Sequence, residues 1–445
     1  MSIINFTDQQ NEILDCNSNN IIISACAGSG KSSTLTEKAF RESIQSKSWK
    51  KIQILTFTNK SKNDLIAKLN NSTNIIISTF HNFIYDNIFP FDEGIDINSS
   101  ENYISRSNSY QGWLEELYSN KVICGSEGKN DFIIEHAIKL MEKNNLKNYL
   151  KSKFHAIYID EAQDNNIQQY NMVELFISLG IKILMVGDAN QTLYTFRGAC
   201  SETFNKYLYD ERFKRYELTQ NFRCHEIINR IANSYSFPDQ HVYDEDKGYF
   251  KINYENIGAI LKKFSNESIA FLKKTNYELV DYGGNFSILK DISFSSHVNE
   301  TVKNVVISLL KLKYKKNYNL YSFLFDINVD VDKYSHQDIL SFRKELEGYI
   351  YKNNNTLDNF LIQIGFFEVK DVIQDTYCHL VELDETKNFI QNTNKHVTMT
   401  IHSSKGLEFD NIILQKNDLY HKGILQKNNF YVSLTRARKR VFVIF

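Results

Sequence analysis

A lysine and a serine close a run of small residues near the start of the chain, in the segment Ala25-Cys-Ala-Gly-Ser-Gly-Lys-Ser32. The backbone N–H groups of such a loop, together with the start of a following helix, can cradle phosphates. Lys31 would reach the β- and γ-phosphates of ATP and Ser32 would hold Mg²⁺. Ala25 stands where the usual phosphate-binding motif has its first glycine. The residues predicted to bind the nucleotide are Ala27, Gly28, Ser29, Gly30, Lys31, Ser32 and Ser33.

Two acids follow a short apolar run in the segment Ile157-Tyr-Ile-Asp-Glu-Ala-Gln-Asp164. Ligands bind at the carboxyl ends of the strands in open parallel sheets, so a strand here would deliver both acids to the nucleotide. Asp160 suits Mg²⁺, directly or through water. Glu161 is then free to take a proton from the attacking water. An isolated Asp-Glu pair is usually a solvated surface pair, and its position after a phosphate-binding loop is what favours catalysis.

These residues need a sheet that places them together, and the sequence predicts one. Short β-branched runs alternate with helical stretches, which is typical of a parallel sheet covered on both faces. The first series of predicted strands covers residues 21–24, 52–57, 75–78, 156–159 and 181–186. A second series covers residues 269–272, 397–400, 412–414 and 441–444. A helix is expected after the phosphate loop, from Ser33 to Phe40, and residues 83–150 are expected to be mostly helical, for example from Asp131 to Leu150.

At this point the chain resembles helicases of superfamily 1, of the UvrD/PcrA/Rep type, because nine motifs follow in the order of that family. The segment Phe6-Thr-Asp-Gln-Gln-Asn-Glu12 is similar to the family's adenine-reading segment, with Gln10 at the glutamine position. The other matching segments are Thr56–Lys60, Ser78–Asn82, Val186–Ala199, Leu218–Arg223, Thr400–Glu408 and Tyr431–Ala437. The resemblance implies ATP hydrolysis with Mg²⁺ that drives movement along single-stranded DNA.

The resemblance also implies roles for residues outside the phosphate loop. Gln191 would sense the γ-phosphate, and Arg223 and Arg436 would contact it. Phe222 would stack on adenine and Glu408 would bond the ribose. An arginine offered from the opposite side of a closing cleft stabilises phosphoryl-transfer charge and contributes roughly 10³- to 10⁵-fold in rate. Outside complete motifs, such residues are more often surface or packing residues.

A motor that follows a single strand needs aromatic faces for bases and donors for phosphates. The resemblance suggests Phe57, Phe80, Tyr194 and Phe196 for stacking, and Phe196 replaces the tryptophan that most relatives carry. DNA and RNA would both satisfy such a surface, and the family points to DNA. The predicted nucleic-acid contacts are Phe57, Thr58, Asn59, Thr79, Phe80, His81, Tyr194, Phe196, Arg197 and His402.

The overall composition sets limits on the partners and the compartment. A net charge of −1 in 445 residues gives no global attraction to nucleic acid, so binding needs a local basic patch. The six cysteines are scattered, without metal-ligand spacing, which favours a reducing compartment. The sequence shows neither a signal peptide nor an apolar run long enough for a membrane helix. We therefore expect a cytoplasmic protein.

The expected fold is α/β, with two RecA-like P-loop NTPase lobes, each built on a parallel sheet and interrupted by a mainly helical insertion. The first lobe is predicted to comprise residues 1–82 and 151–214, with an insertion at 83–150. The second lobe is predicted to comprise residues 215–290 and 396–445, with an insertion at 291–395. These insertions correspond in position to the family's accessory subdomains and are shorter.

Two functions fit these observations. The first is a helicase or translocase that moves 3′ to 5′, in DNA repair for example. The second is a strand-stimulated ATPase that regulates or feeds a separate nuclease, for example in phage defence. Strand-separating relatives carry a β-hairpin wedge near the last motifs, but only nine residues follow Arg436 and the stretch from Glu408 to Tyr431 is short. We therefore expect no wedge and weak unwinding.

Overall fold

The computed structural model describes most of the chain, and it divides into two compact units. The first unit contains residues 1–92, 129–274 and 400–445, and the second contains residues 93–128 and 275–399. The described residues are 5–45, 49–57, 59–69, 74–94, 106–119, 125–126, 131–193, 198–279, 286–289, 292, 294, 298, 300–315, 318–327, 329, 331–352, 356–383, 386–387, 390 and 395–445. The four-segment division into lobes and insertions stays a prediction.

The first sheet is six-stranded and parallel, with the strand order β3-β2-β6-β7-β1-β8. Its strands are β1 (Asn20–Ala25), β2 (Lys51–Thr56), β3 (Ile75–Thr79), β6 (Phe154–Ile159), β7 (Lys182–Gly187) and β8 (Lys214–Leu218). Ile21, Ile22 and Ile23 of β1 are all buried, although neighbouring side chains point to opposite faces. Both faces of the sheet are therefore covered, as the apolar runs predicted.

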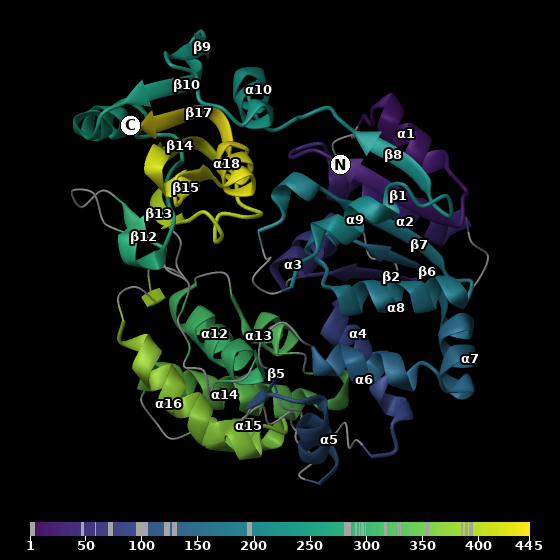
Figure 1. Cartoon of the computed structure of the whole chain (residues 1–445). Helices are drawn as coiled ribbons and strands as arrows, with labels where there is room; N and C mark the ends of the chain where they lie inside the picture. Colours follow the sequence, from purple (N-terminus) through teal and green to yellow (C-terminus); the bar gives the residue numbers. More distant parts are fainter. Residues whose placement is uncertain are drawn as a thin grey trace. The chain divides into compact units, whose positions relative to one another are not determined.

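The helices of the first unit accompany this sheet or the second sheet described below, and α2 and α8 both pack against β7 (Figure 1). They include α1 (Asp8–Asp15), α2 (Lys31–Gln45), α3 (Asn59–Lys68), α4 (Phe80–Asn87), α6 (Phe132–Leu140), α7 (Asn144–Lys153), α8 (Ile167–Ser178), α9 (Ser201–Tyr207), α10 (Glu226–Ser234), α11 (Ile257–Lys263) and α18 (Lys427–Leu434). The stretch from Asp131 to Leu150 is mostly helical, as predicted, and it forms two helices. Asp131 caps α6 through its side chain, and α6 ends at Leu140 before α7 begins.

The second sheet has the strand order β12-β13-β11-β14-β17-β10-β9. Its strands are β9 (Val242–Asp244), β10 (Lys247–Ile252), β11 (Ile269–Lys273), β12 (Ser287–Ile288), β13 (His396–Thr400), β14 (Phe409–Gln415) and β17 (Ala437–Ile444). The pairs β11–β14, β14–β17 and β17–β10 are parallel, whereas β9 is antiparallel to β10. These two sheets, both built mainly from parallel strands, confirm the predicted α/β class.

One predicted boundary shifts by a strand. We expected residues 215–290 to belong to the second lobe, but β8 pairs in parallel with β1 and so extends the first sheet to Leu218. The strand was missed because it has the sequence Lys-Arg-Tyr-Glu-Leu, with mostly exposed side chains at the sheet edge. An edge strand buries too little surface to show an apolar run.

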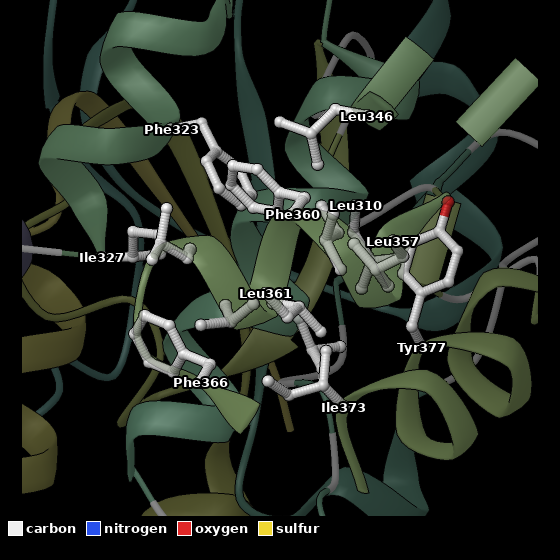
Figure 2. Packing of buried hydrophobic residues seen from close by; sticks show 14 of the residues in the cluster. Leu310, Phe323, Ile327, Leu346, Leu357, Phe360, Leu361, Phe366, Ile373 and Tyr377 are labelled. Atoms are coloured by element: carbon white, nitrogen blue, oxygen red, sulfur yellow. The ribbon is translucent and has the colours of Figure 1, made fainter. Parts of the chain in front are cut away.

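The second unit has a hydrophobic core of its own. Its main helices are α12 (Glu300–Tyr314), α13 (Leu320–Asp326), α14 (His336–Lys352), α15 (Leu357–Gln363) and α16 (Lys370–Val381), with α5 (Tyr110–Ser119) and the short pair β4 (Arg106–Ser107) and β5 (Gly125–Ser126). Figure 2 shows the rings of Phe323 and Phe360 among aliphatic side chains such as Leu310 and Leu361. The ring centres of Phe342 and Phe360 lie 5.3 Å apart.

A short β-hairpin occupies the stretch between Glu408 and Tyr431. Its strands are β15 (Tyr420–His421) and β16 (Ile424–Leu425), and Lys422 and Gly423 form the turn with positive φ angles. The expectation that this stretch is too short for a hairpin is therefore wrong, because a two-residue turn needs very little chain.

A membrane-spanning segment is not found in the part of the chain that the structure describes, because its helices are too short or too polar to cross a bilayer.

Candidate active site

The phosphate-binding loop connects β1 to α2, which begins at Lys31. Gly30 has a φ of +79°, and a Cβ atom there would lie 2.7 Å from Nε2 of Gln10. The side-chain amide of Gln10 donates a hydrogen bond of 3.1 Å to the carbonyl oxygen of Ser29. Gln10 also forms the capping box of α1 with Thr7. The segment predicted to read adenine is thus fixed against the loop.

A second glycine brings the loop against the segment that follows β8. Gly28 has a φ of +70°, and a Cβ atom there would lie 2.6 Å from Cβ of Arg223 and 2.9 Å from Oδ1 of Asn221. The N–H group of Phe222 donates a 2.9 Å hydrogen bond to the carbonyl oxygen of Gly28. The Phe222 side chain is 57% exposed, so its ring is available for stacking.

The loop lines a cleft of about 790 Å³, within the usual range for a small-molecule site. Both sheets contribute to this cleft, because Glu408 precedes β14 and Arg436 precedes β17. The lining residues are Gly28, Ser29, Gly30, Lys31, Ser32, Ser33, Ser61, Asp64, Leu65, Ala67, Lys68, Asp160, Glu161, Gln191, Phe222, Arg223, Gly406, Glu408, Arg436 and Arg438. Two predicted residues are outside this lining set, Gln10 and Ala27; the N–H group of Ala27 donates to the hydroxyl oxygen of Tyr431 at 3.1 Å.

The two acids at the end of β6 face the loop. The Ser32 hydroxyl donates to Oδ2 of Asp160 at 3.2 Å, and Nζ of Lys31 lies 3.9 Å from Oε1 of Glu161. Glu161 adopts a left-handed backbone with a φ of +52°, which is uncommon for a residue with a side chain and typical of functional sites. The loop, the helix start and the acids therefore meet at one point.

The charges around the acids push their pKa values apart. Burial raises the pKa of Asp160, and the negative charge of Glu161 adds to that rise. Burial alone would also raise the pKa of Glu161, but the positive charges of Lys31 and Lys405 outweigh it and hold this pKa below the usual value. Glu161 is therefore ionised at neutral pH and can accept a proton.

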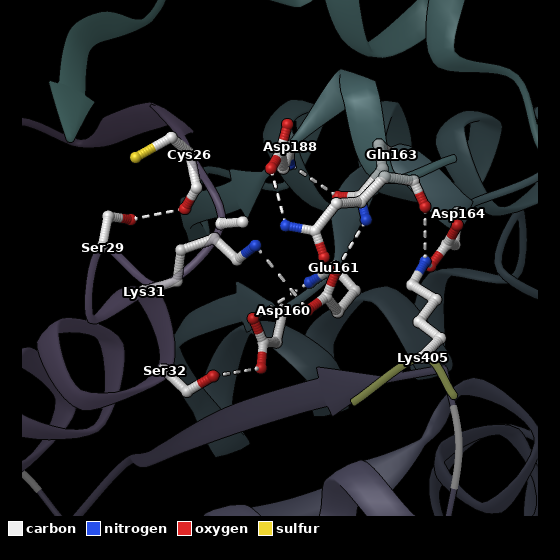
Figure 3. A network of polar contacts seen from close by, with 12 residues as sticks. Cys26, Ser29, Lys31, Ser32, Asp160, Glu161, Gln163, Asp164, Asp188 and Lys405 are labelled. Carbon is white, nitrogen blue, oxygen red and sulfur yellow. Dashed lines mark hydrogen bonds and ion pairs between the residues drawn. The ribbon is translucent and has the colours of Figure 1, made fainter. Parts of the chain in front are cut away.

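A chain of side-chain hydrogen bonds links Glu161 to the end of β7 (Figure 3). Nε2 of Gln163 donates to Oε2 of Glu161 at 2.6 Å, and Oε1 of Gln163 accepts from the N–H group of Asp188 at 2.9 Å. Oδ2 of Asp188 in turn accepts from Nε2 of Gln191 at 2.6 Å. This chain holds the glutamine predicted to sense the γ-phosphate at a fixed place beside the acid.

Arg436 reaches this chain from the end of α18. Arg436 is 1% exposed, and its Nη2 donates to Oε1 of Gln191 at 3.5 Å. Burial lowers its pKa to about 10, so the group stays cationic at neutral pH. The second predicted arginine, Arg223, donates through Nε to Oε1 of Glu408 at 2.7 Å, and Arg438 donates to the other oxygen of that carboxylate at 2.9 Å.

The donors around Ser32 fit a magnesium ion bound with a nucleotide. Mg²⁺ prefers hard oxygen ligands and is usually held in such sites by one or two protein groups together with phosphate oxygens and water. Ser32 and Asp160 supply a hydroxyl and a carboxylate oxygen within 3.2 Å of each other. The described residues contain no group of three or more His, Cys, Asp or Glu side chains that would hold a metal without a nucleotide.

The residues predicted to contact nucleic acid differ in how exposed they are. Oγ1 of Thr79 accepts from the N–H group of Asn82 at 3.3 Å and so caps α4. Phe80 is 1% exposed and packs in the core, so no base can stack on its ring, and we withdraw its predicted role. Nε2 of His81 lies 3.0 Å from Oδ2 of Asp131, and the His81 side chain is partly exposed.

The remaining predicted contacts lie on two loops or outside the described residues. Phe57 follows β2 and is partly buried, and His402 lies in the turn after β13. The structure describes Asn59 as the start of α3 but not its side chain. The predictions that lie outside the described residues are Thr58, Tyr194, Phe196 and Arg197.

Several residues of the site were not predicted. Gln163 and Asp188 orient the predicted groups, and Lys405 contacts Asp164 from the turn after β13. Their only signal in the sequence is their position inside matching motifs. Arg438 shares the carboxylate of Glu408 and has no such signal beyond its place two residues after Arg436.

Comparisons with known proteins agree with this geometry. Residues 6–128 and 97–211 match the UvrD/REP helicase N-terminal domain, and residues 396–444 match the UvrD-like helicase C-terminal domain. The chain is 28% identical to the Gabija protein GajB of Bacillus cereus, over 96% of this chain and 92% of that protein. It is 23% identical to a probable DNA helicase II homolog of Mycoplasma pneumoniae, over 71% of this chain and 57% of that protein.

One more sequence relative and one solved structure are also similar to this chain. The chain is 26% identical to one of the subunits of an ATP-dependent helicase/nuclease from Streptococcus pyogenes, over 68% of this chain but only 24% of that much longer protein. Among solved structures, the Pif1 helicase from Candida albicans aligns with a TM-score of 0.44 and 13% identity, over 99% of this chain and 95% of that chain. The matches at both ends of the chain, on the segments that build the cleft, show that it belongs to the UvrD-like helicase family.

Proposed function

We propose that this protein hydrolyses ATP, with Mg²⁺, to move 3′ to 5′ along single-stranded DNA. The observation that carries the proposal is the contact of Arg436 with Gln191, because it joins the end of one sheet to the catalytic groups of the other. An arginine offered in this way acts on phosphoryl transfer only when the cleft is closed. Hydrolysis and relative movement of the two sheets are thereby linked.

The phosphate-binding loop and the residues around it would bind the nucleotide. The loop N–H groups and the start of α2 would take the phosphates, and Lys31 would turn from Glu161 toward them. Phe222 offers an exposed ring to the adenine. Glu408 would bond the ribose, which requires it to share or release its arginine partners.

Hydrolysis itself falls to the ionised acid. Glu161 would accept the proton of the attacking water, and Gln163 fixes one of its carboxylate oxygens for that task. Ser32 and Asp160 would hold the magnesium ion, which supplies charge neutralisation of the phosphates when it is bound. Gln191 and Arg436, which contact each other, would stabilise the transferred group.

The strand would pass the segments that follow β2, β3 and β13, including the start of α4. Phe57, Thr79, His81 and His402 remain candidates for contact with bases and phosphates, together with Thr58, Asn59, Tyr194, Phe196 and Arg197. Stacking contributes roughly 1–3 kcal/mol per base and needs no particular base sequence. This fits a motor that binds any single strand.

A second function is favoured by the modest size of the hairpin. Its two strands have two residues each, which offers little surface to split base pairs. The protein would then be a strand-stimulated ATPase that serves a separate nuclease, as in phage defence. One relative is a subunit of an ATP-dependent helicase/nuclease, which is compatible with such an association.

Strand displacement by the purified chain separates the two functions. ATP hydrolysis and displacement are measured on single-stranded, 3′-tailed, 5′-tailed and blunt DNA of matched length. A motor displaces the 3′-tailed duplex faster than the 5′-tailed one. Each base-pair step costs about 1.4 kcal/mol of stacking, so a weak wedge should favour A·T-rich duplexes. Stimulated hydrolysis without displacement on any duplex would select the second function.

A further inference from the structure

Lys405 reaches from the second sheet to the turns that follow β6 and β7, and its side chain is almost fully buried. It lies in the turn between β13 and β14, and its side chain is 9% exposed. Nζ of Lys405 pairs with Oδ2 of Asp164, whose side chain is 2% exposed, and donates to the carbonyl oxygen of Gln191 at 2.9 Å. Figure 3 shows the lysine pointing at Asp164 on the side of the acid cluster opposite Ser32.

The two acceptors belong to the two turns that carry catalytic side chains. Asp164 closes the 3-10 turn Ala162–Asp164, which follows Glu161 directly. Gln191 closes the 3-10 turn Ala189–Gln191, and its own side chain contacts Asp188 and Arg436. One ammonium group therefore holds both turns from the other side of the cleft.

The turn that carries Lys405 is itself rigidly built. Oγ of Ser404 is buried and donates to the carbonyl oxygen of Ile401 at 2.7 Å, and the hydroxyls of Thr400 and Ser403 lie 2.8 Å apart. The N–H group of Lys405 donates to the carbonyl oxygen of His402 at 3.1 Å. His402 is a candidate strand contact, so one short turn holds both a nucleic-acid candidate and the buried lysine.

A purely stabilising role explains this pair poorly. Removing two charges from water is costly, and a buried ion pair often adds no net stability over apolar residues of similar size. Oδ1 of Asp164 is also buried without a hydrogen-bond partner among the described residues, so the carboxylate is only half satisfied. Such a pair is better suited to fixing one arrangement of the two sheets than to strengthening the fold.

We propose that Lys405 is a positioning residue that couples closure of the cleft to ATP hydrolysis. When the turn after β13 contacts the first sheet, Lys405 would hold the turns of Glu161 and Gln191 in place. This inference rests on the proposed strand-stimulated ATPase. It predicts an effect on kcat, because Lys405 holds turns that act on the γ-phosphate and the attacking water. The groups that bind ATP lie elsewhere, on the loop and Phe222.

The test uses the full chain and a charge-balanced double variant. Lys405→Met alone would leave the Asp164 carboxylate buried and unpaired, so Lys405→Met is combined with Asp164→Asn. Thermal unfolding checks that this variant folds. ATP turnover is then measured with and without saturating single-stranded DNA. The stimulated kcat should fall by about 5- to 150-fold, the usual size of coupling between two sites, while KM for ATP stays within about threefold.

A conservative variant and the wild type complete the design. Lys405→Arg keeps the charge and both donor contacts, so it should retain most of the stimulated kcat and serves if the double variant does not fold. A folded double variant with wild-type stimulated kcat would overturn the inference, as would a rise in KM alone or loss of stimulation in Lys405→Arg equal to that in the double variant. Wild type without strand stimulation would instead contradict the proposed function.

Discussion

Glu161 combines a strained backbone with an ionised carboxylate. Its φ is +52°, in the left-handed region, and its side chain contacts Lys31 and Gln163. A residue with a side chain holds this conformation only when its surroundings over-determine it. The hydrogen bond from Gln163 and the nearby charges provide that fixation, and they also keep the carboxylate ready to accept a proton.

Glu161→Gln should therefore stop turnover without releasing ATP. The amide has nearly the same shape and can still contact Gln163 and Lys31, but it cannot accept a proton. We expect kcat to fall by about 10²- to 10⁴-fold, the usual contribution of a general base. Binding of a fluorescent ATP analogue should change little. Glu142→Gln, at an exposed surface acid, is the matched control, and a wild-type rate in Glu161→Gln would contradict the assignment.

The residues that could be predicted from sequence are those whose role follows from neighbours in the chain. Lys31 and Ser32 follow a glycine-rich loop, and Asp160 ends an apolar strand, so spacing alone assigns them. Lys405 meets Asp164 from 241 positions away, and no local pattern shows this contact. Phe80 was misjudged because a ring on the buried side of α4 looks the same in sequence as one on its exposed side.

At the level of elements, the site depends on how closely the phosphate loop meets the segment after β8. The backbone bond between Gly28 and Phe222 and the 2.6 Å that a Cβ atom would have to Arg223 leave no room for a side chain at Gly28. Gly180, between α8 and β7, provides a matched comparison. It has a φ of +73°, close to the +70° of Gly28, but no atom within 4 Å of the position of a Cβ.

Gly28→Ala should lose activity where Gly180→Ala does not. Both variants force alanine into a left-handed conformation, which costs roughly 1–2 kcal/mol of stability. Only Gly28→Ala also collides with Arg223 and Asn221, and misplacement by about 1 Å can cost about 10²-fold in rate. We expect similar small losses in thermal stability and a large loss of kcat for Gly28→Ala alone. Equal kcat values in the two variants would show that the close approach does not matter.

The central strands of both sheets were predictable because their apolar runs are buried on two faces. Edge elements were not. β8 is largely exposed and charged, and β9 has only three residues. The hairpin β15–β16 was excluded on length, although its turn at Lys422 and Gly423 uses two residues in positive φ and so needs almost no chain. Short edge structures escape patterns that depend on burial.

At the level of the whole molecule, we expect ATP hydrolysis to depend on a bound strand. The cleft takes residues from both sheets, and Lys405 and Arg436 reach from the second sheet to the acids and Gln191 of the first. The turn of Lys405 also carries His402, a candidate strand contact. A bound strand that holds this turn against the first sheet would place Lys405 and Arg436 beside the acids and Gln191. An ATPase that is not coupled to a strand would need no such arrangement.

The most direct measurement is the rate of ATP hydrolysis by the purified full chain as single-stranded DNA is added, with Glu161→Gln as the background. We predict a low rate without DNA and a large, saturable rise in kcat, with an apparent DNA affinity that weakens as salt increases. A rate that is the same with and without DNA, and absent only in Glu161→Gln, would contradict this prediction by showing an ATPase that is not coupled to a strand.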